Sequence, residues 1–281
     1  MHSELFQLGG IPLHMYGLCM AIGFLLAWRA MVYLRKRTNQ PYEDLATLLT
    51  WVMISSVVGA RTAYVIEHWS AEFAHNPMSI LRIDQGGLMF YGGLIAALVM
   101  CIGYALYCKM NFFDIADVTA TAVPIGQFFG RLGCFMHGCC YGNRTDAWYG
   151  VCFPKGSPAW HEQVSSGLIS HATTKALPVI PTQLIESFAT LILFVVLFVL
   201  YPRHYKERGF VGGCYLMGYA ILRFIIEYMR GDPRAVVGPF SIGQTISILI
   251  FLCGVACMVW AKTKGRSSTV MQVIDPSKQN S

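Results

Sequence analysis

The sequence predicts an all-α polytopic membrane protein with seven transmembrane helices. Hydrophobic residues make up 55% of the 281 residues and charged residues only 13%, whereas soluble chains carry about 25% charged residues. The apolar residues gather in stretches of about 20 residues, the length that a helix needs to cross a bilayer. Basic residues cluster between these stretches, which is typical of chains that cross a membrane repeatedly.

The seven predicted helices follow the apolar stretches. They lie near residues 14–34, 46–67, 88–107, 114–133, 182–201, 211–229 and 241–261. The first residues lack the basic segment and cleavage site of a signal peptide, so we expect the first stretch to be retained. Residues 1–265 are expected to form a single membrane domain with an extracytoplasmic loop region at about 134–181. Residues 266–281 are expected to form a short, disordered cytoplasmic tail.

The basic residues predict the orientation of the helices. Residues 35–37 are all basic and follow the first stretch, and further basic residues follow the third, fifth and seventh stretches. Loops rich in lysine and arginine remain on the cytoplasmic side. We therefore expect the N-terminus outside and the C-terminus in the cytoplasm. The net charge of +6 is explained by this pattern, so we expect no nucleic-acid partner.

The most unusual stretch is residues 126–142, where Arg131 lies among five glycines at the end of an apolar run. An arginine at the bilayer centre costs roughly 2.5 to 3.5 kcal/mol, so it needs a compensating partner. Because glycines weaken a helix, we expect the fourth helix to reach the membrane face and break into a polar pocket around Arg131. His137 lies in this break and could take a proton near neutral pH.

A second charged group lies near the end of the sixth stretch. Arg223, Glu227 and Arg230 are spaced i, i+4 and i+7, which predicts one helical face. Charged residues within a span face a protein interior or a water-filled pocket. Two arginines and one carboxylate leave a net positive charge, and a guanidinium can bind phosphate with two hydrogen bonds. Glu227 could instead serve only to neutralise an arginine.

Further polar residues in the stretches gather toward the same outer side. For Arg61 a structural role is the favoured interpretation, because Glu67 is close in sequence. The glycines around Gly92 could allow close helix packing or keep backbone donors open to a ligand. A histidine at a membrane interface is usually a hydrogen-bonding residue, which is the favoured interpretation of His14. The remaining members of this group are Tyr16, Tyr64, Tyr91, Gln183 and Glu186.

Four cysteines lie close together in sequence: Cys134, Cys139, Cys140 and Cys152. With His137 they could form a zinc site, but their spacing matches no familiar ligand pair. Outside the cytoplasm a disulfide to Cys152 competes with metal binding. A nucleophilic cysteine with His137 as its base is a further alternative. Packing of the thiols in apolar surroundings is the favoured interpretation, so we predict no metal and no cofactor.

Six sequence blocks carry a resemblance to a known family. They are LHMYG (13–17), GARTAY (59–64), GGLMFYGGLI (86–95), GRLG (130–133), PTQLIE (181–186) and RFIIEYMR (223–230). In this order, over nearly the whole chain, they resemble the phosphatidylglycerol–prolipoprotein diacylglyceryl transferases of bacteria. Each block alone is a weak signal, whereas all six together are specific.

The resemblance implies a multi-pass enzyme of the bacterial inner membrane. Such an enzyme transfers the diacylglyceryl group of phosphatidylglycerol to the lipobox cysteine of a preprolipoprotein and releases glycerol phosphate. Its expected partners are therefore phosphatidylglycerol, the preprolipoprotein and the bilayer. Residue by residue, the resemblance implies that Arg131 and Arg223 hold the phosphate, that Glu227 orients Arg223 and that Tyr16 binds the headgroup. Gly92 and Gly142 belong to its substrate-binding segments, and Arg61 and Arg230 would support the site.

The chain departs from the family's usual pattern at four positions. Tyr91 stands where the family usually has a histidine that has been proposed as the base. Cys134 replaces the usual asparagine, Cys139 the usual glutamate and Ile180 the usual histidine. The phosphate-binding half of the pattern is therefore retained, and the proton-handling half is altered.

The identity of the base stays open at this point. Tyr91 is a poor base, because the pKa of tyrosine is about 10, and His14 or His137 could replace it. One alternative function is a related phospholipid-dependent transferase or hydrolase with a different acceptor. A second alternative, an anion or lipid transporter, is disfavoured because transporters often contain two related halves, which this sequence lacks.

Overall fold

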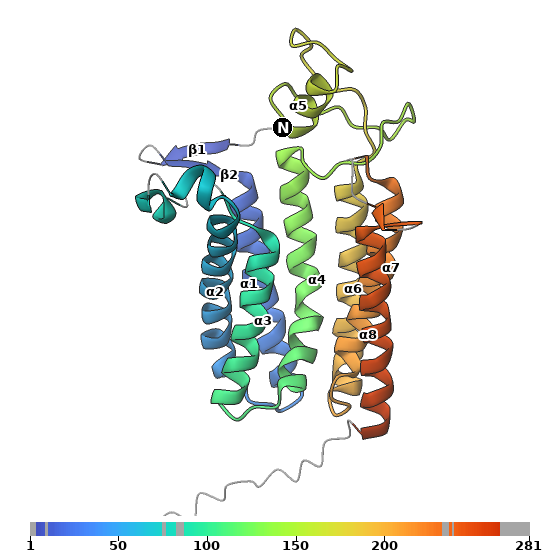
Figure 1. Cartoon of the computed structure of the whole chain (residues 1–281). Helices are drawn as coiled ribbons and strands as arrows, with labels where there is room; N and C mark the ends of the chain where they lie inside the picture. The colour runs from blue at the N-terminus through green and yellow to red at the C-terminus, as the bar shows by residue number, and fades with distance from the viewer. Residues whose placement is uncertain are drawn as a thin grey trace, which may run out of the picture.

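The computed structural model describes residues 4–8, 11–74, 77–82, 87–231, 236–237 and 239–264. Within these residues, seven long α-helices run alongside one another as a bundle (Figure 1). They are α1 (Met15–Arg37), α2 (Asp44–Glu67), α3 (Phe90–Tyr107), α4 (Phe112–His137), α6 (Thr182–His204), α7 (Phe210–Met229) and α8 (Ile242–Lys264). Each coincides with one predicted stretch to within about four residues at either end, so the all-α prediction is confirmed.

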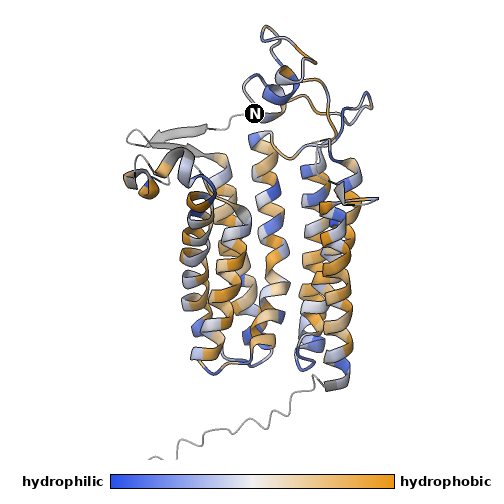
Figure 2. Ribbon diagram, in the orientation of Figure 1, coloured by the Kyte–Doolittle hydropathy of each residue, from blue (hydrophilic) through white to orange (hydrophobic). Residues whose placement is uncertain are grey.

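The bundle has the composition of a multi-pass membrane protein. Five of its helices, α1, α2, α6, α7 and α8, are long and apolar enough to cross a membrane. The apolar helix α3 is shorter, and α4 contains Asp114, Asp117 and Arg131. Figure 2 shows that apolar residues dominate the helices, while hydrophilic residues gather at their ends and in the segment above the bundle. The number of spans and their orientation remain predictions.

Helix α4 lies at the centre of the bundle and packs against α1, α6 and α7, while α2 packs against α3 and α7 against α8. The contact of α2 with α3 requires glycine. A Cβ atom on Gly92 would lie 2.5 Å from the carbonyl oxygen of Gly59, far inside normal contact distance. Of the two interpretations of Gly92, the structure therefore favours close helix packing.

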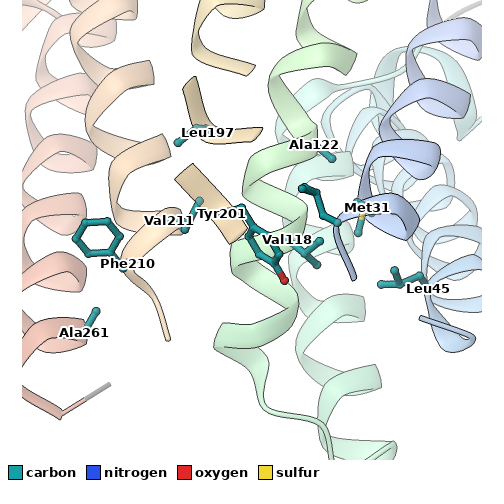
Figure 3. Close-up of a cluster of buried hydrophobic side chains, with 10 residues drawn as sticks. Met31, Leu45, Val118, Ala122, Leu197, Tyr201, Phe210, Val211 and Ala261 are labelled. Carbon is teal, nitrogen blue, oxygen red and sulfur yellow. The ribbon is translucent and has the colours of Figure 1, made fainter. Parts of the chain in front are cut away.

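The largest buried cluster lies in the half of the bundle that contains the α1–α2 and α6–α7 connections (Figure 3). It joins six helices, so it fixes this end of the bundle as one unit. The Tyr201 hydroxyl reaches from it to the Gln40 side chain at 3.0 Å. The cluster consists of Met31, Leu34, Leu45, Val118, Ala122, Leu197, Tyr201, Phe210, Val211 and Ala261.

The opposite end of the bundle is covered by residues 138–181, which include the short helix α5 (Pro158–Ser165) (Figure 1). This segment has a small core of its own, formed by Tyr141, Phe153, Ala159, Trp160, Ala176 and Val179. The same end carries a π-helical turn (Trp69–Phe73), a 3-10 helix (Pro77–Leu81) and the strands β1 (Glu4–Leu8), β2 (Ile11–His14), β3 (Val236–Val237) and β4 (Phe240–Ser241). Strands β1 and β2 pair antiparallel, as do β3 and β4. The tail at 266–281 lies outside the described residues.

Candidate functional site

Helix α4 carries Arg131 into the site without a break. It continues to His137 and ends at Gly138, whose left-handed φ of 80° closes the helix. The expected break around Arg131 is therefore wrong, because a nearby glycine serves packing instead. A Cβ atom on Gly133 would lie 2.8 Å from Cδ2 of Tyr16 on α1. This contact brings the Tyr16 side chain within electrostatic range of Arg131.

Arg131 and Arg223 are each paired with a buried carboxylate. Nη2 of Arg131 lies 2.8 Å from Oε1 of Glu186 on α6, and Nη2 of Arg223 lies 3.0 Å from Oε2 of Glu227 one turn later on α7. The carboxylate side chains are 4% and 3% exposed, whereas the arginine side chains retain 22% and 17% exposure. Each carboxylate thus holds its arginine through Nη2, and part of each guanidinium side chain remains exposed.

Donors remain on these arginines after the ion pairs are counted. A guanidinium has five N–H donors and no acceptor. Nη1 of Arg223 is buried and has no hydrogen-bond partner within the described part of the chain. A buried donor without a partner costs about 1 to 3 kcal/mol, so an anion bound at this position would remove a penalty as well as add a contact.

Tyr219 joins the two ion pairs into one site. It lies one turn before Arg223 on α7, and Glu186, Arg131 and Arg223 all act on it electrostatically. Helices α4, α6 and α7 therefore bring both guanidinium groups into one site, called the cationic site below, although its two ion pairs are neutral overall. The sequence interpretation missed Tyr219, although its spacing of four residues from Arg223 places it on the same helical face.

Three thiols lie beside Arg131 at the end of α4. The Sγ atoms of Cys134, Cys139 and Cys140 all lie within 4.8 Å of one another, and all three residues are half-buried. The Cys139 thiol donates to the Cys134 carbonyl oxygen at 3.8 Å. The neighbouring Cys134 and Cys139 thiols lower the pKa of the Cys140 thiol, and the positive charge of Arg131 lowers it further. Cys152 is an exposed free thiol outside this cluster. The structure therefore does not contain the disulfide to Cys152 that the sequence left open.

The backbone of this cysteine segment is tightly fixed. The Gln183 side-chain amide donates to the carbonyl oxygen of Cys139, and the Thr182 hydroxyl to that of Cys140, both at 2.8 Å. Cys140 adopts a left-handed φ of 62°, which costs a residue other than glycine about 1 kcal/mol or more. Such a conformation persists only where the surroundings enforce it, as the first turn of α6 does here.

Gly142 and Arg230 meet immediately beyond the cysteines. They form an antiparallel β-bridge, and Arg230 caps α7 in an extended conformation. The expected continuous helical face therefore holds for Arg223 and Glu227 but not for Arg230, because the helix ends at Met229. A Cβ atom on Gly142 would lie 2.5 Å from the Met229 carbonyl oxygen, so the bridge requires glycine. A cavity of about 280 Å³ adjoins Gly142 on the side of α5.

Arg61 organises the connection between α2 and α3. Its side-chain nitrogens donate to the carbonyl oxygens of Ile80 at 2.9 Å, Gly87 at 3.1 Å, Ser79 at 2.6 Å and Arg82 at 3.2 Å. The residue is only 8% exposed. This geometry agrees with the structural interpretation of Arg61, which positions a loop by satisfying its carbonyl groups.

The three candidate bases lie at different places at the end of the bundle that residues 138–181 cover. Tyr91 is in the first turn of α3 and is 63% exposed. His137 is the exposed last residue of α4. His14 ends strand β2, and its side chain lies outside the described part of the structure. Two thiols of the cysteine cluster, those of Cys134 and Cys140, lie within electrostatic range of Arg131.

Comparison with known proteins identifies the family. The profile described as prolipoprotein diacylglyceryl transferase matches residues 3–260. Phosphatidylglycerol–prolipoprotein diacylglyceryl transferase of Proteus mirabilis is 32% identical, over 94% of this chain and 93% of its own length. The protein of that name from Aliivibrio salmonicida is 33% identical over 99% and 93%, and the one numbered 2 from Clostridium perfringens is 31% identical over 96% and 99%. The chain therefore belongs to the prolipoprotein diacylglyceryl transferase family.

Proposed function

We propose that this protein transfers the diacylglyceryl group of phosphatidylglycerol to the lipobox cysteine thiol of a preprolipoprotein and releases glycerol phosphate. The observation that carries the proposal is the shared site of Arg131 and Arg223, with a buried Nη1 that lacks a partner in the described residues. Family membership and the names of the relatives support the same pair of substrates.

The chemistry follows from the charge that develops on the leaving group. The thiolate sulfur attacks the glycerol carbon next to the phosphate ester, the carbon–oxygen bond breaks, and its electron pair remains on the phosphate. Arg131 and Arg223 stabilise this growing negative charge where it forms. Glu186 and Glu227 hold the guanidinium groups in place before the lipid binds, so little reorganisation is needed during the reaction.

The other site residues take supporting roles in this proposal. Tyr16 contacts the headgroup beside Arg131, and the bridge between Gly142 and Arg230 closes the outer side. Arg61 holds the α2–α3 connection in place, and Gly92 allows its two helices to meet. Tyr91, His14 and His137 are the side chains from which a base could come.

The lipid reaches the site from the membrane. In our proposal all seven long helices span the bacterial inner membrane, with the N-terminus outside and the C-terminus in the cytoplasm. The cationic site then lies in the outer leaflet. An apolar pocket of about 200 Å³ between α7 and α8, lined by residues that include Ile221, Ile225 and Phe251, accommodates part of an acyl chain.

A transfer assay with phosphatidylglycerol vesicles and a lipobox peptide tests the proposal. The wild-type protein should produce thioether-linked peptide and glycerol phosphate, and Arg223→Ala should reduce this by at least about 100-fold, the effect of losing one charge-stabilising donor group. Arg208→Ala, at the other end of the bundle, is the matched control. Glycerol phosphate released equally without peptide would instead favour a hydrolase, and wild-type turnover in Arg223→Ala would contradict the proposed site.

A further inference from the structure

The cluster of Cys134, Cys139 and Cys140 is the strongest group of metal-ligating atoms in the described part of the chain. Its three sulfurs come from the last turn of α4 and the residues just after it, and each pair is separated by no more than 4.8 Å. Thiolates are soft ligands that select zinc over calcium or magnesium. Zinc–sulfur bonds of about 2.3 Å place the sulfurs of a tetrahedral site about 3.8 Å apart, so closure requires shifts of about 1 Å or less.

Adjacent cysteines are awkward ligands for one ion unless the backbone turns between them. That turn is present: Gly138 and Cys140 both have a left-handed φ, of 80° and 62°. The amide of Cys139 also donates to the Cys134 carbonyl oxygen at 3.2 Å, which closes the loop that joins the ligands. The local backbone therefore allows the adjacent residues Cys139 and Cys140 to bind one ion.

Residues outside the cluster hold these ligands in position. The hydrogen bonds from Gln183 and Thr182 to the carbonyl oxygens of Cys139 and Cys140 fix the segment against α6. Hydrogen bonds that hold the ligand residues in place are typical of sites that bind a metal in a defined geometry. Arg131 and Arg230 both lie within electrostatic range of Cys140, so their positive charges offset the negative charge of three thiolates.

We propose that Cys134, Cys139 and Cys140 bind one Zn²⁺ ion whose fourth position receives the lipobox cysteine of the preprolipoprotein. Catalytic zinc sites characteristically have three protein ligands and one open position. A thiol that coordinates zinc loses its proton, which supplies the nucleophile that this reaction needs. The identity of this fourth ligand rests on the proposed function, whereas the three-cysteine site does not. The proposal replaces our expectation from sequence that the protein binds no metal.

The reaction balances without an oxidant or a reductant. The substrate thiol forms a sulfur–zinc bond, its S–H bond breaks, and the proton passes to solvent. The sulfur then forms a bond to the glycerol carbon as the bond from that carbon to the phosphate oxygen breaks. The electron pair of the broken bond stays on glycerol phosphate beside Arg131. The thioether product is a weaker ligand than a thiolate, so it leaves the ion and vacates the fourth position.

Zinc content of the full-length protein, purified in detergent, tests the metal site. We expect about one zinc per chain in the wild type, at least a tenfold loss in Cys139→Ser, and full retention in Cys152→Ser, whose thiol lies outside the cluster. Cobalt(II) added to metal-free wild-type protein should give intense sulfur-to-metal charge-transfer absorption, and this measurement requires no variant to fold. Metal-free wild type that binds neither ion while its three thiols are reduced would overturn the proposal.

A second measurement tests the fourth position. A lipobox peptide with cysteine should increase the cobalt charge-transfer absorption, and the same peptide with serine should leave it unchanged. Removing zinc should lower transfer at least tenfold, and adding Zn²⁺ should restore it. Full transfer by metal-free protein would overturn the zinc proposal and leave the proposed function intact. One bound zinc in a protein that transfers nothing would support the three-cysteine site and refute the proposed function.

Discussion

Charged residues lie near both ends of α4, and the two ends differ in how completely these residues are hydrogen-bonded. Near the N-terminal end of α4, next to the large buried cluster, Asp117 is 2% exposed and accepts hydrogen bonds from the backbone amides of Gly209 at 2.8 Å and Gly212 at 2.7 Å. Asp114 pairs with Arg208 at 2.9 Å. Both carboxylates thus have partners in or next to the connection between α6 and α7, and these contacts hold the connection in place.

Near the C-terminal end of α4, the charged groups have only part of their hydrogen-bonding capacity satisfied. Arg131 and Arg223 each have one carboxylate partner, yet both retain exposure and Nη1 of Arg223 lacks a partner among the described residues. Buried polar groups with their hydrogen bonds satisfied contribute to a unique fold, whereas an unpartnered donor on an arginine that stays partly exposed favours binding of an anion. Along α4, how completely a charged side chain is hydrogen-bonded, rather than its charge, separates residues that serve the fold from residues of the candidate site.

The largest effect is expected when Arg131 is changed to alanine. Transfer should fall by about 100-fold to 1,000-fold, because a group that stabilises the departing phosphate is lost. The change also leaves Glu186 buried and unpaired, which costs stability. The double variant Arg131→Ala/Glu186→Ala removes that unpaired charge, so it should recover thermal stability while remaining inactive in the peptide transfer assay. Recovery of transfer in the double variant would mean that Arg131 serves only the fold.

For Asp117→Ala, near the N-terminal end of α4, we expect a loss of stability without a loss of turnover. Two buried amides lose their acceptor, so the free energy of unfolding should fall by about 2 to 4 kcal/mol. Turnover per folded molecule should stay within about twofold of the wild type, because the residue is remote from the cationic site. Denaturation in detergent, followed by circular dichroism and paired with the transfer assay, measures both quantities. A large loss of turnover at unchanged stability would contradict the division between the two ends.

A smaller effect is expected for Tyr219→Phe. The change removes the hydroxyl that lies within electrostatic range of Arg131 and Arg223, and a hydrogen bond from this hydroxyl to the bound lipid would contribute about 0.5 to 1.5 kcal/mol. Turnover should therefore fall about 3-fold to 10-fold with little change in stability. Steady-state kinetics over a range of phosphatidylglycerol concentrations would reveal the loss, and unchanged kinetics would remove Tyr219 from the site.

The smallest effect is expected for Arg208→Ala. Its pair with Asp114 is partly exposed, and such pairs contribute about 0 to 1 kcal/mol. Both stability and transfer should remain close to wild type in the same two assays. A loss of transfer in this variant would show that arginine substitutions affect activity regardless of position, and would weaken the interpretation of Arg131.

The helices were largely predictable because a 20-residue apolar stretch is a strong and local signal. The end of α4 was less predictable. Gly133 serves contact with α1, while Gly138 ends the helix, and a sequence does not distinguish these uses of glycine. Arg230 was placed on a helical face by spacing alone, but the helix ends one residue earlier.

The site was predictable where its residues repeat along one helix and less so where distant segments meet. The spacing of Arg223 and Glu227 indicated their pairing, and the sequence blocks indicated the family, which is confirmed. The thiol cluster depends on left-handed backbone at Gly138 and Cys140, which composition does not reveal. The sequence grouped Cys134, Cys139 and Cys140 with Cys152, whereas the structure brings only the first three together.

Equilibrium binding of phosphatidylglycerol tests the central claim most directly, because it isolates the cationic site from the acceptor and from the thiol chemistry. The affinity of the detergent-purified wild type should exceed that of Arg223→Ala by at least about tenfold, the value of a charge-assisted hydrogen bond. The affinity of Arg208→Ala should equal that of the wild type. Equal affinity in the wild type and Arg223→Ala would contradict the account.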